Sequence, residues 1–225
     1  MINLIKKILP RKLINLVGFY LIFFSKKIHH KTYNGFYKDK FGDYLPWFTY
    51  PCIEFLKTLN LTDKKVLEFG SGSSTLFWSK KCLFVYSIEK DKSWFDKLNK
   101  KTIKNVKLFL FEDDENYSCF PLQLREKFDV LVIDGAARKN TLFNSIKLLN
   151  DDGIIIFDNI EWYPNCAKYL RKQDYIQIDF SGFSPLNSFE SCTSIFFKKT
   201  KNFEKRLIPE NWHPIGGRFL KAYDD

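Results

Sequence analysis

The chain has 225 residues, of which 45% are hydrophobic and 18% aromatic, so it can bury one sizeable core and is not disordered as a whole. Its formal charge of +10 would suggest nucleic acid or an anionic membrane as a partner. However, residues 1–40 hold nine basic residues and one acidic residue, which leaves about +2 for the remainder, so we expect no nucleic-acid platform there.

Residues 1–40 are predicted to form a basic amphipathic extension, followed by a single domain over residues 41–225. The apolar run Leu13–Phe24 is too short to cross a bilayer, which needs ~20 residues. Residues 25–30 offer no small-residue cleavage site, which argues against a signal peptide. Residues 1–30 therefore either lie in the interface of an anionic membrane or pack on the domain or a partner, and the pattern does not separate these possibilities.

Five widely spaced cysteines without a C-x-x-C pair argue against a zinc site or a disulfide framework. They fit a reducing compartment. We expect a cytoplasmic protein, peripheral on the inner face of a membrane if the extension binds lipid.

The first element of the domain with a chemical signature is a strand followed by a glycine turn. Val66–Phe69 reads as a short strand, residues 70–75 (GSGSST) as the turn, and Leu76 opens a helix. Such a turn lets a ligand approach the backbone, and the amides at the helix start attract its oxygens. A second strand, Leu83–Ile88, ends in Glu89, which is placed to accept hydrogen bonds from ribose hydroxyls.

These parts indicate a nucleoside-binding βαβ unit. A dinucleotide site of a dehydrogenase is the closest alternative. Its fingerprint wants a third small residue where Thr75 stands, and Glu68 lies two residues ahead of the first glycine. Both features favour a different nucleoside ligand.

The same residues resemble the class I S-adenosylmethionine-dependent methyltransferases. The segment 66–72 (VLEFGSG) looks like their first motif and 87–89 (SIE) like their second. Residues 106–114, 128–135 and 148–159 resemble the third, fourth and fifth strands with their turns, so that the match covers about residues 45–198.

The resemblance implies S-adenosylmethionine as cofactor and assigns roles to particular residues. Glu68, Gly70 and Gly72 would surround its methionine part, Glu89 its ribose, and Asp113 or a neighbour its adenine, with Asp134 also at the cofactor. For the acidic run 112–115 a solvated turn is an equal alternative.

A metal site is a further hypothesis, because acidic and amide side chains close two neighbouring strands. Asp134 follows the fourth strand, and Asp158 and Asn159 follow the fifth. Their oxygens would suit Mg²⁺, which would orient and acidify a substrate hydroxyl. The trio also resembles the ligand set of catechol and caffeoyl-coenzyme A O-methyltransferases. Two backbone turns are the simpler interpretation.

Without a metal, Asp134 is the candidate catalytic residue, as a general base or a positioning group for the hydroxyl. Arg138 and Lys139 could meet an anionic substrate, although a solvated basic helix start is the more ordinary interpretation of both.

Two strands at 175–180 and 193–197 complete the prediction as a terminal hairpin. The expected fold is α/β: a Rossmann-like, mostly parallel sheet with a C-terminal antiparallel hairpin and helices on both faces.

The expected function is O-methyl transfer from S-adenosylmethionine to a hydroxyl of a small molecule, a glycan or a lipid-linked sugar. A nucleotide-dependent oxidoreductase and a non-catalytic membrane-associated nucleoside-binding protein are the alternatives.

Overall fold

Short runs of β-branched and aromatic residues alternate with helical segments along the chain, and this alternation produces an α/β fold. The computed structural model describes residues 10–24, 30–31, 35–101, 103–187 and 189–199. Its strands are β1 His30–Lys31, β2 Tyr37–Lys38, β3 Lys65–Phe69, β4 Phe84–Glu89, β5 Val106–Leu110, β6 Phe128–Ile133, β7 Leu149–Asp158, β8 Tyr175–Gly182 and β9 Ser191–Lys198. Its α-helices are α2 Arg11–Phe24, α3 Tyr50–Lys57, α4 Ser73–Lys81, α5 Lys92–Asn99, α6 Asp114–Cys119, α7 Arg138–Ser145 and α8 Pro164–Lys172.

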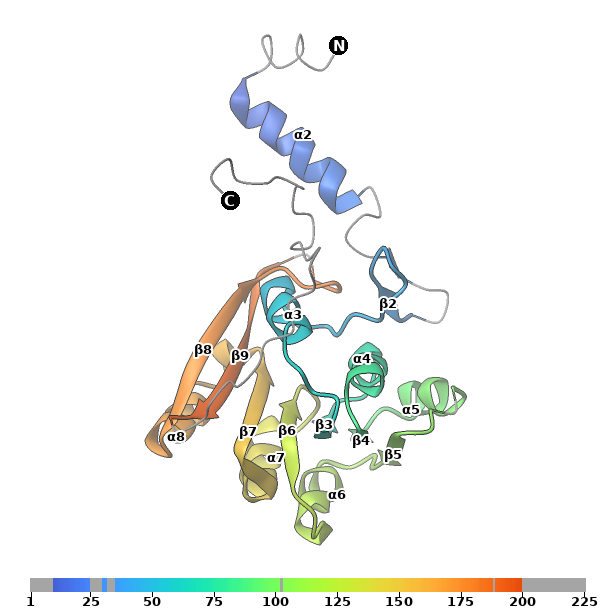
Figure 1. Cartoon of the computed structure of the whole chain (residues 1–225), viewed down its shortest axis with the longest axis vertical. Coiled ribbons are helices and arrows are strands. Elements are labelled where there is room, and N and C mark those ends of the chain that lie inside the picture. Colours follow the sequence, from blue (N-terminus) through green and yellow to red (C-terminus); the bar gives the residue numbers. More distant parts are fainter. Residues whose placement is uncertain (1–9, 25–29, 32–34, 102, 188, 200–225) are drawn as a thin grey trace.

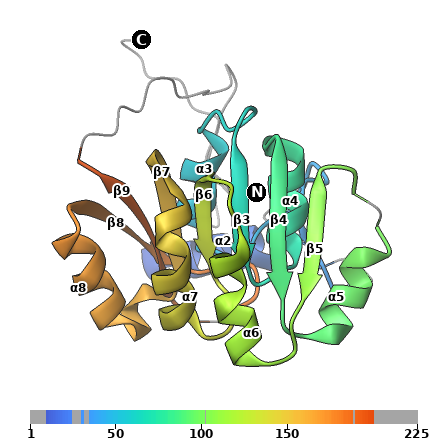
Figure 2. The same cartoon turned by 90° about the horizontal axis from the view of Figure 1, so that it is seen from below.

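Seven of these strands form one sheet in the order β5-β4-β3-β6-β7-β9-β8 (Figure 2). The first five pair in parallel, and β9 pairs antiparallel with both β7 and β8. In the centre, Val66 of β3 pairs with Val85 of β4 on one side and Val130 of β6 on the other. This sheet confirms the predicted fold class, including the terminal hairpin.

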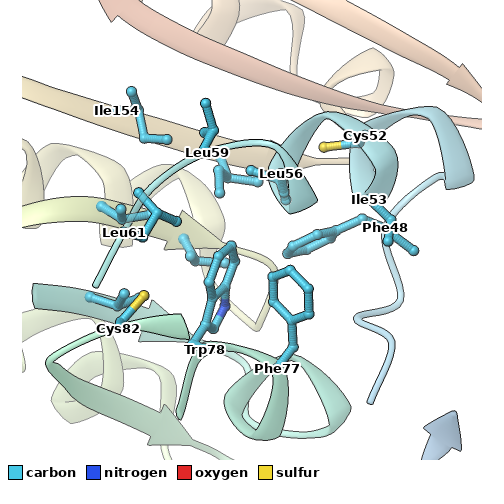
Figure 3. Close-up of a cluster of buried hydrophobic side chains, with 14 of the residues drawn as sticks. Phe48, Cys52, Ile53, Leu56, Leu59, Leu61, Phe77, Trp78, Cys82 and Ile154 are labelled. Atoms are coloured by element: carbon cyan, nitrogen blue, oxygen red, sulfur yellow. The ribbon is translucent and has the colours of Figure 1, made fainter. Parts of the chain in front are cut away.

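The two faces of the sheet follow from alternation along β3. Val66 faces a cluster with α3 and α4, whereas Leu67 faces a second cluster with α6, α7 and α8. Figure 3 shows the first cluster, in which Phe77 and Trp78 of α4 meet the side chains of α3 and its flanking segments. Because both faces are covered at the centre of the sheet, the strands β3, β4 and β6 are largely buried, whereas the edge strand β8 is partly exposed.

A lead-in segment, residues 36–49, runs along the carboxyl ends of the strands before α3 begins. Tyr37 N donates to Ser73 Oγ at 3.0 Å, and Thr49 N donates to Thr193 Oγ1 at 3.1 Å. Phe36 is fully buried, so packing of the domain begins inside the range that was expected to be extension.

Helix α2 begins directly after Pro10 and includes the apolar run Leu13–Phe24. The Pro10 carbonyl accepts from Leu13 N at 2.9 Å, which closes the first turn. Figure 1 shows α2 beyond α3 and β2, away from the seven-stranded sheet. Among the described helices, none has the length and apolar character needed to traverse a bilayer. The other parts of the predicted amphipathic segment, residues 1–9 and 25–29, lie outside the described residues.

Two glycines allow the carboxyl ends of β3 and β6 to approach each other closely. A Cβ on Gly70 would lie 2.8 Å from Gly135 N, and a Cβ on Gly135 would lie 2.8 Å from Gly70 N and 1.9 Å from Tyr117 Oη. Gly70 also has a φ of +95°, which side chains disfavour. The turn after β3 therefore depends on glycine at both positions.

We predict that Gly135→Ala destabilises the protein by roughly 2 kcal/mol or more, because a methyl group there overlaps backbone atoms that cannot rotate away. Urea unfolding measures the change. Adding Tyr117→Phe removes the nearest oxygen but leaves Gly70 N in place, so only part of the loss is expected to return. An unchanged unfolding midpoint in Gly135→Ala would contradict the assigned contact.

Candidate active site

The candidate site lies where β3 and β6 run side by side in the centre of the sheet. From this pair the chain order proceeds outward in opposite directions, through β4 on one side and β7 on the other. Ligands of open α/β sheets bind at such a switch point, beyond the carboxyl ends of the strands. The predicted residues that end or follow these four strands are Glu68, Gly70, Gly72, Glu89, Asp134, Asp158 and Asn159.

A buried carboxyl group, that of Glu68, supports the glycine turn through hydrogen bonds. Glu68 has no exposed surface, and its Oε2 accepts from Thr75 Oγ1 and Ser87 Oγ, each at 2.5 Å. Thr75 Oγ1 in turn accepts from Gly72 N at 3.0 Å, and Ser71 Oγ lies 2.8 Å from Ser87 Oγ. The structure therefore shows Glu68 supporting the turn; direct contact with a cofactor stays a prediction.

Burial raises the pKa of Glu68 to about 7, although the hydroxyl groups that donate to it oppose the shift. The carboxyl group is thus partly protonated near neutral pH. Because Glu68 is fully buried beneath the backbone of the turn, its carboxylate is strongly desolvated.

Glu89 closes the other side of the turn. Its Oε2 accepts from Ser71 N at 2.7 Å, and its Oε1 accepts from Lys90 N at 2.7 Å and Asp91 N at 2.8 Å. A carboxylate offers about four lone-pair sites, so one remains for a ligand hydroxyl. Burial raises the pKa of Glu89, against the effect of these three amides. Its predicted contact with ribose is compatible with this geometry and stays untested.

Gly72 faces open space. A Cβ added there would meet no atom of the described residues within 4 Å, in contrast to Gly70 and Gly135. Its position immediately before α4 places this space at a helix N-terminus, where backbone amides attract ligand oxygens. The turn therefore has a packed side and an open side.

Asp113 has a local role. It is exposed and precedes α6, where its Oδ1 accepts from Asn116 N at 2.8 Å and its Oδ2 from Asn116 Nδ2 at 2.9 Å. These bonds lower its pKa. The structure thus shows an N-cap at this position, and the predicted contact with adenine remains a prediction.

On the other side of the switch point, the guanidinium of Arg138 joins the ends of β6 and β7. Nε donates to Gly135 O at 2.9 Å, Nη1 to Asp158 O and to Asn159 Oδ1 at 3.1 Å, and Nη2 to Asp134 O at 2.7 Å and Oδ1 at 3.3 Å. These contacts use all five N–H donors. The interpretation of Arg138 as part of a solvated helix start was wrong, because its side chain is only 12% exposed.

Asp134 and Asp158 titrate as an interacting pair. Burial is the main cause that raises both pKa values, and the neighbouring Asp158 charge raises that of Asp134 further, whereas Arg138 opposes both shifts. The pKa of Asp158 is raised to about 6, with Thr193 Oγ1 donating to its Oδ1. The pair consequently retains a proton at pH values where free carboxyl groups are ionised.

The three predicted metal ligands lie close together, but the guanidinium of Arg138 bonds to all three residues. Two of their side-chain oxygens, Asp134 Oδ1 and Asn159 Oδ1, already accept from its guanidinium. Within the described residues, no group of three or more His, Cys, Asp or Glu side chains could hold an ion. The donor set therefore does not fit Mg²⁺, because an ion would have to displace a buried arginine.

Asn159 contributes a donor without a partner. Its residue is 5% exposed and adopts a left-handed conformation with φ of 52°. Because Arg138 can only donate, Oδ1 of Asn159 must face it, which leaves the buried Nδ2 with no acceptor among the described residues. A buried amide of this kind is a ready donor for a ligand oxygen.

Sequence reasoning missed the supporting role of several residues at the site, although it considered Thr75 and Arg138 for other roles. Those that hold the turn or the strand ends are Ser71, Thr75, Ser87, Arg138 and Thr193. The hydroxyl residues Thr75 and Ser87 were the available signal, since a buried carboxyl group requires donors.

The described chain has the fold of class I S-adenosylmethionine-dependent methyltransferases. It is similar to an rRNA methylase from Streptococcus thermophilus, with a TM-score of 0.51 and 13% identity over 66% of this chain and 96% of that chain. It is also similar to spermidine synthase from Thermotoga maritima, with a TM-score of 0.54 and 15% identity over 84% of this chain and 73% of that one.

No family model matches the sequence, and no curated protein matches it either. The likeness to solved structures at these identities is a likeness of fold.

The buried position of Glu68 generates a prediction about stability. Its folded pKa of about 7 exceeds its ordinary value of 4.5, so its contribution is present below pH 4.5 and is lost as pH rises to about 7. Relative to Glu68→Gln, the wild type should lose about 3 kcal/mol across this range. Urea unfolding of both proteins at the two ends of the range measures this difference; a constant difference would show that Glu68 ionises normally.

The Arg138 cluster predicts how the protein responds to Mg²⁺. Mg²⁺ should leave the melting temperature of the wild type unchanged, because Arg138 occupies the ligand oxygens. Arg138→Ala should be less stable by about 3 kcal/mol and should regain stability with Mg²⁺. Lys139→Ala, which removes an exposed neighbouring charge, is the control. Stabilisation of the wild type by Mg²⁺ would restore the metal hypothesis.

Proposed function

We propose that this protein is an S-adenosylmethionine-dependent methyltransferase that methylates a hydroxyl group. The single observation that carries the proposal is the turn after β3, which is packed against β6 at Gly70 and open at Gly72. It lies at the switch point of a sheet with the methyltransferase fold, where such enzymes bind their cofactor.

The residues present fit that cofactor. The open side of Gly72 leaves room for a ligand against the backbone, and Glu89 keeps one acceptor site for a ribose hydroxyl. When bound, S-adenosylmethionine supplies a methyl group on a sulfonium, which is an activated leaving group. Gly70, Gly72 and Glu89 would hold it, with Glu68 fixing the turn beneath.

Asp134 is the proposed catalytic base. Its carboxylate, once deprotonated, accepts the proton of the acceptor hydroxyl at Oδ1 or Oδ2, while Arg138 fixes its orientation from the other side. The free Nδ2 of Asn159 donates to a second oxygen of the acceptor. The protein's contribution is then mainly positioning of the hydroxyl, in line with the methyl group.

A small molecule, a glycan or a lipid-linked sugar is the proposed acceptor class. Support comes from the free Nδ2 of Asn159, which suits an acceptor that carries a second oxygen. An amine acceptor would also use Asp134 as a base. Screening of acceptors is therefore what would distinguish N-methylation from O-methylation.

Two other functions make different predictions. A nucleotide-dependent oxidoreductase is disfavoured because Thr75 stands where a dinucleotide site needs a small residue, and here Thr75 bonds Glu68 and Gly72 N. Raised pKa values of carboxyl groups are typical of catalytic sites. Those of Asp134 and Asp158 therefore disfavour a non-catalytic nucleoside-binding protein.

Calorimetry with S-adenosylhomocysteine and with NAD tests the proposal. We expect binding of S-adenosylhomocysteine alone, and loss of at least about tenfold in affinity in Gly72→Ala, because a methyl group fills the space that the cofactor needs while meeting no protein atom. The unfolding midpoint of Gly72→Ala should stay close to wild type. Binding of NAD alone, or of neither compound, would reject the proposal.

Asp134→Asn separates the base from the cofactor site. Methyl transfer to a panel of polyols and catechols should fall by about 10² or more, while the affinity for S-adenosylhomocysteine stays within a few-fold. Because the pKa of Asp134 is raised, the wild-type rate should increase with pH above about 6, where Asp158 has lost its proton. A rate that is flat over this range would remove the base role.

A further inference from the structure

Helix α2 exposes a continuous apolar stripe. Leu13, Leu16, Val17 and Tyr20 follow the i, i+3, i+4, i+7 spacing of one helix face, with 40%, 62%, 46% and 59% of their surface exposed. At this spacing apolar residues of a globular protein normally face a core. Here the face is turned outward on a helix that stands beyond α3 (Figure 1).

Charge around this stripe has one sign. The first 38 residues contain no aspartate or glutamate. Arg11 and Lys12 open the helix and are exposed, and in the sequence Lys26 and Lys27 come shortly after its last residue, Phe24. An apolar stripe with basic groups at both ends matches the acyl boundary and the acidic headgroups of an anionic bilayer.

The length of α2 sets its orientation. Fourteen residues extend about 21 Å along the helix axis, against ~30 Å for a hydrocarbon core. The helix therefore fits in the plane of the interface, where its stripe enters the acyl boundary and the basic groups remain at headgroup level.

We propose that α2 docks this protein on an anionic lipid surface through the face formed by Leu13, Leu16, Val17 and Tyr20. A second copy of the chain is a poorer occupant, because its own extension carries the same basic charge and would repel. The rest of the chain has a net charge of about +2, so it offers the basic extension of a second copy no net attraction.

Docking of α2 on a membrane would also bring the carboxyl edge of the sheet, with the candidate site, toward that membrane. The lead-in segment that follows the extension is tied to Ser73 at the start of α4 and to Thr193 beside Asp158. The part of the chain through which the extension enters the domain, residues 36–49, therefore lies along the carboxyl edge of the sheet.

Sedimentation of the full-length protein with vesicles tests the proposal. One vesicle preparation contains phosphatidylcholine alone and the other an equal mixture of phosphatidylcholine and phosphatidylglycerol. We expect binding to the mixed vesicles, little binding to phosphatidylcholine, and weakening by high salt.

Two double variants separate the apolar and the charged contributions. Leu16→Gln with Val17→Gln keeps the charge and should weaken binding by about tenfold or more. Arg11→Gln with Lys12→Gln keeps the stripe and should weaken it on the order of 30-fold, about fivefold for each charge. Leu122→Gln, at a residue that is 50% exposed on the domain, is the matched control and should bind like wild type.

The outcomes are distinguishable. Equal vesicle binding by wild type and Leu16→Gln/Val17→Gln overturns the proposal. So does absence of binding to mixed vesicles, and light scattering that then shows a dimer lost in the same variant would assign the stripe to a second copy. Circular dichroism confirms that each variant is folded. Binding of S-adenosylhomocysteine is measured separately, so a failure of the membrane proposal leaves the proposed function untouched.

Discussion

The contact between Gly70 and Gly135 is the constraint on which the rest of the site depends. It brings the carboxyl ends of β3 and β6 within contact of each other's backbone, at distances that no side chain would allow. The glycine turn after β3 and Asp134, which precedes Gly135, are placed by this approach. Asp134 N can then donate to Phe69 O at 3.0 Å, which continues the ladder beyond the last paired residues and turns Asp134 toward the edge.

Polar groups at this edge are organised as two separate networks. On the β4 side, Glu68 and Glu89 accept from hydroxyls and backbone amides and so fix the turn without a cation. On the β7 side, Asp134 and Asp158 share one arginine. The effect of burial on the carboxyl groups is therefore opposed in different ways in the two halves. Hydrogen bonds from hydroxyls and backbone amides oppose it on one side, and the charge of Arg138 opposes it on the other.

Strands and their order could be predicted because each central strand is a short apolar run that ends in Gly, Asp or Glu, and because the resemblance supplied the order. The clustering of Asp134, Asp158 and Asn159 was predicted in the same way, since parallel strands end at one edge. What fills that cluster could not be predicted. The position of Arg138 depends on where the first turn of α7 directs its side chain, which a sequence pattern does not contain.

Full use of the Arg138 donors bears on which acceptors the site can select. An arginine near a catalytic carboxylate commonly recruits phosphate or carboxylate groups, but this one has no N–H left to offer. With one proton on the Asp134–Asp158 pair, the cluster has one negative and one positive charge and is neutral. If the proposed function holds, an anionic group on the acceptor would thus gain nothing from this cluster, and selectivity in this half of the site would rest on neutral hydrogen bonding and shape.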